Sequence, residues 1–441
     1  MIDPAFARNR ILGEQLREMV DAGNSTFSAG AALDVEFEVQ ASPDASRDPR
    51  TVVDVVISAN EINDKHGTGP LVKRIFHGRK SIFSIRSKND WGGQDFGDWN
   101  VCIPQGERER PEYFGRVLAA LGNRRVRQTL CVPFLADEVK TAIAVKEIYG
   151  GKLCSYLMDD QNVAAHNIPD DLMTEFFSRC SLRLVTHAEL RDAYERKFGM
   201  EFFVLPAVVP DHLVAREPVE FSPPGEETGV LIGSFWDQSW FDRTCDVLEG
   251  LDCRIDWFGN NKSPWLRFPP EDLERAGITA RGLVPEPELA RRLRDYSYVI
   301  VPVGAFDDKE NNTGVARLSL PGRILFAVST SHTPLLLLGS EETCGARFVR
   351  HFDLGEVAPY SGSAVGAAIH RLLDPTTQRR MRQNALAVGP KFSDRGVVEW
   401  LEKSIEAGCP ADERFEEIFT GYDSTPVLAG LGLDQAAVPG G

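Results

Sequence analysis

An alternation of short apolar runs with helical patterns constrains the fold of this chain more than any other feature. Buried parallel strands have apolar runs of this length, and the helices between them cover the sheet. The expected strands form two blocks, 51–58, 81–85, 129–135, 152–158, 182–186 and 202–206, then 229–233, 254–259, 278–282, 298–303, 334–338 and 347–349. A proline-rich stretch over 210–225 separates the blocks. We therefore predict an α/β protein with two Rossmann-like, doubly wound domains that face a central cleft.

The length of the chain supports the same division. A chain of 441 residues exceeds what one hydrophobic core usually serves. We expect an N-terminal domain over 1–215, a C-terminal domain over 216–390 and a further helix within 391–422. The tail over 423–441 is rich in Gly, Ala and Pro, so we expect it to be disordered. An amphipathic pattern near the start of the chain predicts a helix over residues 1 to about 30 and does not fit a secretion signal.

Composition argues against several classes of partner. The formal net charge of −16 argues against nucleic acid, whose phosphates are bound by clustered Lys and Arg, but it permits a small anion in a local basic pocket. The longest apolar runs are strand-sized, whereas a transmembrane helix needs ~18 apolar residues. The eight cysteines show no CxxC spacing, which favours free thiols in a reducing cytoplasm over disulfides or zinc. We expect a cytoplasmic protein without a metal or an organic cofactor.

The segment 282–339 carries the clearest binding signal of the second block. It contains the run Ser319-Leu320-Pro321-Gly322-Arg323, at which we expect a helix to begin, with Ser319 as its N-cap and Pro321 in its first turn. Free backbone N–H groups at such an N-terminus, together with Arg323, suit a phosphate group. The alternative interpretation is the helix of an ordinary βα unit, without a ligand.

The first block offers candidates for acid–base chemistry. Asp159 and Asp160 directly follow an expected strand, and carboxylates at that end of a parallel sheet face the ligand. Either carboxylate is a candidate to orient or deprotonate a hydroxyl group, with His66 and His166 as competitors. An acidic pair is also common as a helix cap or turn, and a lone His is more often a packed or solvated residue. The glycines of one loop let its backbone approach a ligand closely: His66, Gly67, Thr68 and Gly69.

Six pieces of the second block stand in an informative order. They are Leu231-Ile232-Gly233, Trp257-Phe258-Gly259-Asn260, Gly282-Leu283-Val284-Pro285-Glu286-Pro287-Glu288-Leu289, Val299-Ile300-Val301-Pro302, Ser319-Leu320-Pro321-Gly322-Arg323 and His332-Thr333-Pro334-Leu335. Their order and spacing resemble the nucleotide-sugar domain of GT-B glycosyltransferases, especially the large retaining family four, between about residues 229 and 387. In the first block, Val185-Thr186-His187-Ala188-Glu189-Leu190 and Phe203-Val204-Leu205-Pro206 resemble the last units of the family's N-terminal domain.

The resemblance implies transfer of a sugar, with retention, from a nucleotide sugar to a hydroxyl group of a glycan, lipid-linked or small-molecule acceptor. It also implies that the helix within 391–422 crosses back onto the first domain. A diphosphate held by a helix dipole and fixed cations needs no metal, and peripheral membrane contact is compatible with such acceptors. The donor would be held by Gly233, Ser234, Arg243, Gly259, Leu283, Val284, Ser319, Leu320, Gly322 and Arg323, and the acceptor-side loop would be Gly67, Thr68 and Gly69.

Some of these roles depend on the resemblance more than others. Leu283 and Val284 would meet the nucleotide base through main-chain groups, which only the resemblance implies. The backbone of Gly233 and Ser234 would face the phosphates from the loop opposite the helix start. Arg243 is a second candidate cation, and a plain surface Arg is the alternative interpretation of that residue.

The chain departs from the family at a position that matters for the donor. The family has an acidic residue one turn into the donor helix, where it holds the ribose hydroxyls, and the spacing to Pro334 places Phe326 or Ala327 there. Arg323 stands where Lys is commoner. Two rival interpretations therefore remain, a nucleotide-sugar 2-epimerase of the same fold and a non-catalytic module that binds a nucleotide sugar or a glycan.

Overall fold

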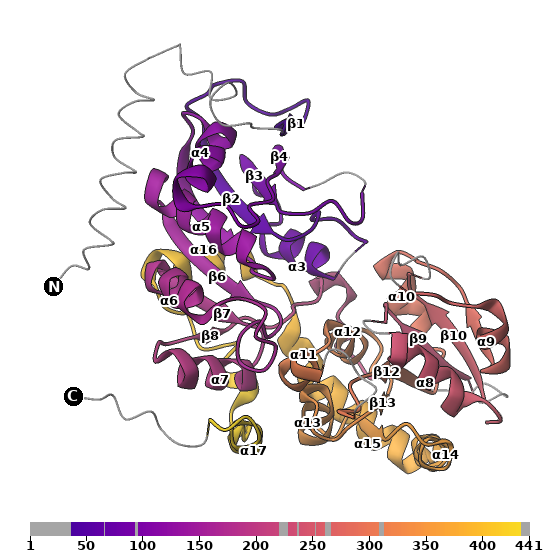
Figure 1. The fold of residues 1–441 in the computed structure, drawn as a ribbon. Helices are drawn as coiled ribbons and strands as arrows, with labels where there is room; N and C mark the ends of the chain where they lie inside the picture. The colour runs from indigo at the N-terminus through magenta and orange to yellow at the C-terminus, as the bar shows by residue number, and fades with distance from the viewer. Residues whose placement is uncertain are drawn as a thin grey trace.

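The computed structural model describes residues 37–65, 67–92, 96–219, 228–235, 238–251, 253–260, 266–307 and 313–433. These residues form two α/β domains, each built around its own sheet (Figure 1). The prediction of an α/β protein with two Rossmann-like domains is confirmed. The helix expected at the start of the chain and the candidate His66 lie outside the described residues.

The N-terminal sheet has eight strands in the order β1-β4-β3-β2-β5-β6-β7-β8. Among its strand pairs, only β1 and β4 run antiparallel. Strands β2 and β6 are buried along nearly their whole length, which explains their continuous apolar runs. The bounds are β1 Gln40–Ala41, β2 Val52–Ser58, β3 Ile82–Arg86, β4 Trp99–Cys102, β5 Arg125–Cys131, β6 Lys152–Leu157, β7 Leu182–Val185 and β8 Phe203–Val204.

Among the described residues, five helices that precede the second domain and one C-terminal helix cover this sheet. The former are α3 Thr68–Ile75, α4 Arg110–Leu121, α5 Ala136–Tyr149, α6 Asp170–Arg179 and α7 Ala188–Phe198. Helix α5 packs between α4 and α6, whereas α3 packs against the returning helix α16 (Val397–Ala407), which also contacts β6. Figure 1 shows α16 among the elements of the first domain, whereas α14 (Gly362–Leu373) and α15 (Pro375–Val388), which precede it, lie in the second domain.

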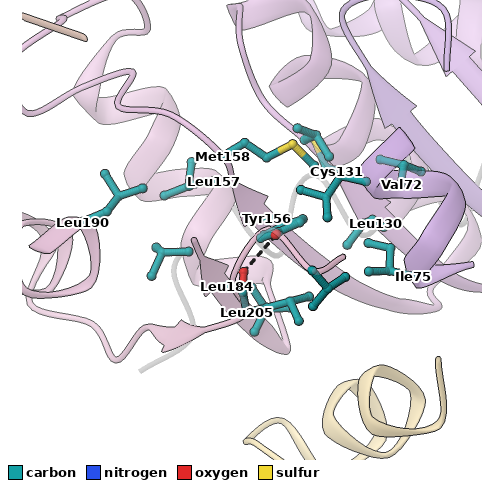
Figure 2. Packing of buried hydrophobic residues seen from close by; sticks show 14 of the residues in the cluster. Val72, Ile75, Leu130, Cys131, Tyr156, Leu157, Met158, Leu184, Leu190 and Leu205 are labelled. Carbon is teal, nitrogen blue, oxygen red and sulfur yellow. Dashed lines mark hydrogen bonds between the residues drawn. The ribbon is translucent and has the colours of Figure 1, made fainter. Parts of the chain in front are cut away.

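The core of the first domain is apolar, and its buried polar groups have partners inside it. Figure 2 shows Tyr156 of β6 among aliphatic side chains that include Leu130 and Leu184. Its hydroxyl donates a hydrogen bond of 2.8 Å to the carbonyl oxygen of Leu205. Burial raises the pKa of Tyr156, so the hydroxyl keeps the proton that it donates. This bond fixes the chain where it leaves the last strand of the domain, and it offsets the cost of burying a polar group.

The C-terminal sheet has six parallel strands in the order β11-β10-β9-β12-β13-β14. Strand order reverses between β9 and β12, and ligands of open α/β sheets bind beyond the carboxyl ends at such a point. The strands are β9 Thr228–Ile232, β10 Arg254–Phe258, β11 Ile278–Ala280, β12 Tyr298–Pro302, β13 Leu335–Leu338 and β14 Gly355–Ala358. The helices are α8 Gln238–Leu248, α9 Pro270–Arg275, α10 Glu286–Leu293, α11 Thr313–Leu318, α12 Gly322–Thr330, α13 Cys344–His351, α14 Gly362–Leu373 and α15 Pro375–Val388.

The structure differs from the sequence prediction at two segments in the last hundred residues. The segment 347–349, expected to be a strand, lies inside helix α13, and the strand at this point of the chain is β14. The hydroxyl of Thr343 caps α13 by accepting from the backbone N–H of Ala346. Part of the tail expected to be disordered is helical instead, because α17 (Thr425–Gly430) buries Val427 and Leu428 and packs against α7.

The eight cysteines form no disulfide bond. Burial raises the pKa of several thiols, that of Cys180 to about 12, so these side chains are protonated and act as small apolar residues of the core. In the part of the chain that the structure describes, no helix has both the length and the apolar character that a membrane crossing requires.

Candidate active site at the domain boundary

Residues of both domains meet at loops that follow the carboxyl ends of strands. Asp159 follows β6, and the hydroxyl of Ser319, between α11 and α12 of the other domain, faces its carboxylate. A small hollow lies beside Ser319, lined by Trp240, Pro302, Val303, Ala316, Ser319, Pro321 and Arg323. The fold thus brings together three residues that the sequence analysis selected separately: Asp159, Ser319 and Arg323.

Helix α12 starts later than expected. Its N-cap is Pro321 and its first residue is Gly322, so the prediction that Ser319 caps this helix was wrong. Pro321 has no N–H group, and the open donors of the first turn therefore begin at Gly322, which is exposed. Ser319 is buried, as is Leu320, and the Ser319 hydroxyl has no hydrogen-bond partner of ordinary geometry among the described residues. The hydroxyl lies beside the Asp159 carboxylate and lowers the pKa of that group.

The guanidinium of Arg323 joins the start of α12 to the end of β9. It donates to the carbonyl oxygens of Ile232 at 2.9 Å and Ser234 at 2.5 Å. Burial lowers the pKa of Arg323 to about 10, so the group is still a cation at neutral pH. Gly233, between the two acceptors, has φ +80°, and a Cβ there would lie 3.3 Å from Cζ of Arg323. A fixed positive charge therefore lies beside a helix N-terminus, where both favour an anion.

The turns after β9 and β10 approach each other closely. A Cβ on Gly259 would lie 2.0 Å from the carbonyl oxygen of Gly233, so a glycine is required at this position. The indole Nε1 of Trp257 donates to the same oxygen at 2.9 Å. Gly233, Ser234 and Gly259 therefore form one fixed edge next to the start of α12.

The other donor candidates differ in how open they are. Arg243, in α8, forms an ion pair with Asp307 at 2.5 Å, so its charge is already balanced by a carboxylate. Leu283, after β11, exposes 61% of its surface, whereas Val284 is half-buried and packs against the core. Leu283 is thus an apolar side chain that the fold leaves open beyond the end of a strand.

The two adjacent carboxylates after β6 occupy different environments. Asp160 is buried and accepts hydrogen bonds of 2.7–3.0 Å from the backbone N–H groups of a tight loop and from one phenol, namely those of Asn162, Val163, Ala164, Ala165 and Tyr194. These bonds give Asp160 a structural role. Asp159 is half-buried; burial raises its pKa to about 6, the charge of Asp160 adds to the rise, and the Ser319 hydroxyl lowers it. Of the two, Asp159 is the acid–base candidate.

The proposed acceptor-side loop leads into helix α3, with Gly67 as N-cap and Thr68 and Gly69 in the first turn. A Cβ on Gly69 would lie 1.9 Å from the carbonyl oxygen of Asn63, so the loop can fold this closely only around a glycine. At the other end of α3, Arg74 pairs with Glu286, the first residue of α10. This ion pair holds the α3 side of the first domain against the second domain.

The predicted competitor His166 lies in the loop that follows Asp160. It is exposed on the loop that Asp160 organises, and its φ is +51°. His187, for which the sequence pattern predicts no role of its own, is buried after β7 beside the backbone of Leu318. Burial and then the charge of Arg347 lower the pKa of His187 to about 3, so its imidazole is neutral. Its Nδ1 lies 2.9 Å from the Thr186 hydroxyl.

One group of possible metal ligands occurs within the described residues. Ligand atoms of His187, Glu189 and Cys344 lie within 4.8 Å of one another, and all three residues are buried. The carboxylate of Glu189, however, receives Nε and Nη2 of Arg347 on its two oxygens, at 2.6 and 2.5 Å. A guanidinium in this position repels a further cation, and the arrangement therefore fits an ion pair better than a metal centre.

The position where the family has a ribose-binding acid belongs to the core. Phe326 is 8% exposed and Ala327 is 0% exposed, on a helix whose residues from Ile324 onward are buried. An acid at Ala327 would be buried without a partner, so a contact with a ribose would need another group.

Comparisons with known proteins give structural matches alone. No family model matches the chain, and no curated protein matches it by sequence. The Anabaena protein Alr3699/HepE, solved in complex with UDP and glucose, matches with a TM-score of 0.56 and 13% identity, over 80% of this chain and 100% of that one. The galactosyltransferase WaaB of the lipopolysaccharide outer core matches with a TM-score of 0.52 and 11% identity, over 81% of this chain and 99% of that one. A UDP-N-acetylglucosamine 2-epimerase matches with a TM-score of 0.50 and 10% identity, over 81% of this chain and 97% of that one.

These matches extend over both domains and cover nearly the whole length of each matching chain. At such low identity they speak for the architecture alone, which in this chain is a pair of α/β domains with one sheet each. The protein has the GT-B fold.

Proposed function

We propose that this protein is a glycosyltransferase that moves a sugar from a nucleotide sugar to a hydroxyl group of an acceptor. The observation that supports this most directly is the position of Asp159 opposite Ser319, next to the α12 N-terminus and Arg323, at the domain boundary of a GT-B fold. One side of this boundary suits a diphosphate, and the other suits a hydroxyl that loses a proton.

On the donor side, the diphosphate would lie at the first turn of α12. The N–H group of Gly322, the charge of Arg323 and the glycine edge of Gly233 and Gly259 face the negative charge that grows as the glycosidic bond breaks. Leu283 would lie against the nucleotide base through its exposed apolar surface. Since Arg243 is paired with Asp307, we assign it an indirect role in shaping this region.

On the acceptor side, Asp159 would receive the proton of the attacking hydroxyl. The acceptor oxygen bonds to the anomeric carbon on the face from which the diphosphate departs, the bond from that carbon to the diphosphate oxygen breaks, and the nucleoside diphosphate leaves, so that the configuration is retained. A pKa of about 6 keeps Asp159 ionised at neutral pH and raises its basicity above that of an ordinary aspartate. The Ser319 hydroxyl, which faces the Asp159 carboxylate, would hold that carboxylate toward the acceptor.

The finer points of the proposal follow the resemblance to family four. We infer retention of configuration, catalysis without a metal or an organic cofactor, a glycan, lipid-linked or small-molecule acceptor, and a cytoplasmic location. Contact with the ribose would come from a group other than Phe326 or Ala327, because both are core residues.

A panel of UDP-, GDP-, ADP- and dTDP-sugars tests the proposal. We expect one nucleotide class to raise the melting temperature of the protein, and its sugar to appear on an added acceptor together with free nucleotide. Stabilisation without any release of nucleotide would favour the non-catalytic binding module. No stabilisation by any member of the panel would contradict the proposal.

A 2-epimerase is the second candidate, because a UDP-N-acetylglucosamine 2-epimerase is among the structural matches at the same coverage. An epimerase needs no acceptor, and its product is a changed nucleotide sugar or free sugar. Product analysis with and without acceptor separates the two, since a transferase makes its glycosylated product only when the acceptor is present.

A further inference from the structure

The Glu189 carboxylate of the first domain is bonded by groups from the far end of the chain. Glu189 lies in the first turn of α7 and is 0% exposed. Arg347 of α13 donates to both of its oxygens, the Tyr422 hydroxyl donates to one of them at 3.0 Å, and the thiol of Cys344 lies against it. A buried carboxylate held in this way keeps its partners in place, because losing one would leave a charge without compensation.

The same guanidinium also holds the loop that carries Ser319. Nη2 of Arg347 donates to the carbonyl oxygen of Arg317 at 2.9 Å, and Nη1 donates to the carbonyl oxygen of Glu342. The next residue after Arg317 is Leu318, whose backbone lies beside His187 of the first domain, and Ser319 follows opposite Asp159. One side chain therefore links the first domain to the three residues before the phosphate-binding turn.

We propose that Arg347 is a positioning residue, which uses its bidentate bond to Glu189 to set the separation between Ser319 on one domain and Asp159 on the other. The inference rests on the proposed transfer reaction, in which Asp159 is the base and Ser319 orients its carboxylate. Tyr422 connects this ion pair to the C-terminal segment, because its hydroxyl donates to the same Glu189 oxygen that Nε of Arg347 binds. A planar, forked guanidinium is required for this role, and the point charge of a lysine cannot replace it.

A second ion pair of the same kind supplies a matched control. Arg191 of α7 pairs with Glu416, and Glu416 also accepts from the backbone N–H of Val204 at 2.6 Å. This pair ties the C-terminal segment to the first domain as Glu189 does, but neither residue bonds to the loop 317–319 in the described structure. Glu416→Gln therefore weakens a comparable ion pair and leaves the bonds of Arg347 to Glu189 and to the loop 317–319 intact.

The test compares Arg347→Lys, Glu189→Gln and Glu416→Gln in the full-length protein. We expect Arg347→Lys and Glu189→Gln to lower kcat by on the order of 100-fold, as small misplacements of catalytic groups do, while the donor Kd measured by calorimetry changes less than about threefold. Hydrogen exchange of the backbone amides in 317–320 should be faster in both variants. Glu416→Gln should leave kcat and this local exchange at the wild-type level.

Three outcomes would overturn the proposal. Wild-type kcat and wild-type exchange in Arg347→Lys would show that lysine suffices and that the bidentate geometry has no role. An equal loss of kcat in Glu416→Gln would show a general effect of the C-terminal segment. If the wild-type protein transfers no sugar, the proposed function fails, and hydrogen exchange alone then decides: equal exchange in 317–320 for all variants overturns the positioning role.

Discussion

The two domains meet with the same end of their sheets, but the two sides of the boundary carry different chemistry. The C-terminal side is built from main-chain groups and glycines, with Arg323 as a fixed cation that itself binds the carbonyl groups of Ile232 and Ser234. The N-terminal side is built from side chains that titrate or that are buried with a charge, of which Asp159 and Glu189 are examples.

This difference assigns separate tasks to the two sides. Backbone N–H groups and a guanidinium hold an anion regardless of pH, because none of them loses its proton near neutrality. A half-buried carboxylate with a raised pKa can accept a proton, whereas backbone N–H groups and a guanidinium cannot. Substitutions of Asp159 and of the groups that position it should therefore affect the rate of the chemical step, and substitutions of the donor-binding groups on the C-terminal side should affect donor affinity.

The largest effect is expected at Asp159. Asp159→Asn should lower kcat by about 10²–10⁴, the usual contribution of a general base, with donor affinity unchanged in calorimetry. The adjacent Asp160→Asn is the matched control: it should weaken folding by about 1–3 kcal/mol in a denaturant titration, because the new amide group cannot serve all the N–H donors around it. Wild-type kcat in Asp159→Asn would contradict the division between the two sides.

The pH dependence of the rate gives a related test. With a pKa of about 6, Asp159 is deprotonated and active as a base above this pH, so kcat/KM should rise with pH and level off above about 7. At pH 4 the ionised fraction is about 1%, which predicts a loss of about 100-fold. The profile of Asp159→Asn should lack this step. A step with the same midpoint in that variant would assign the titration to another group.

The fold was predictable from the sequence because parallel strands buried on both faces leave continuous apolar runs. Helix α5 was not predictable in this way, because it is buried on nearly all sides and its sequence shows no amphipathic pattern. The segment 347–349 was too short to distinguish a strand from a turn of helix. Short patterns of this kind define the order of elements better than their type.

The site was predictable only in part. Position after a strand identified the pair Asp159 and Asp160, but their different roles depend on a loop that turns back onto Asp160 alone. The bond from Arg347 to Glu189 joins residues 158 positions apart and leaves no local pattern. Burial at the domain boundary raises the pKa of Asp159 and encloses the ion pair of Glu189. This burial is set by tertiary packing and not by any motif.

On the C-terminal side, Arg323→Ala should weaken donor binding by about 10–100-fold, because a charge-assisted contact with the diphosphate is lost and the edge of Ser234 is released. Arg323→Lys should recover only part of this loss, since an ammonium group cannot bridge two carbonyl oxygens in the same plane. Arg243→Ala is the comparison, and its smaller effect would follow from the pairing with Asp307. Equal donor Kd values for wild type and Arg323→Ala would refute the assignment.

The smallest effect is expected at Leu283, which exposes more of its surface than any other large apolar residue described, with Val52 next at 50%. If the nucleotide base covers Leu283, truncation to Ala removes roughly 1 kcal/mol of burial, and the donor Kd should rise by about fivefold. Val52→Ala, on a strand of the other domain, removes a similarly exposed side chain and should leave the donor Kd unchanged. Because kcat should not move in either variant, an effect of Leu283→Ala on kcat instead of Kd would place that side chain on the catalytic side and break the separation of tasks between the two domains.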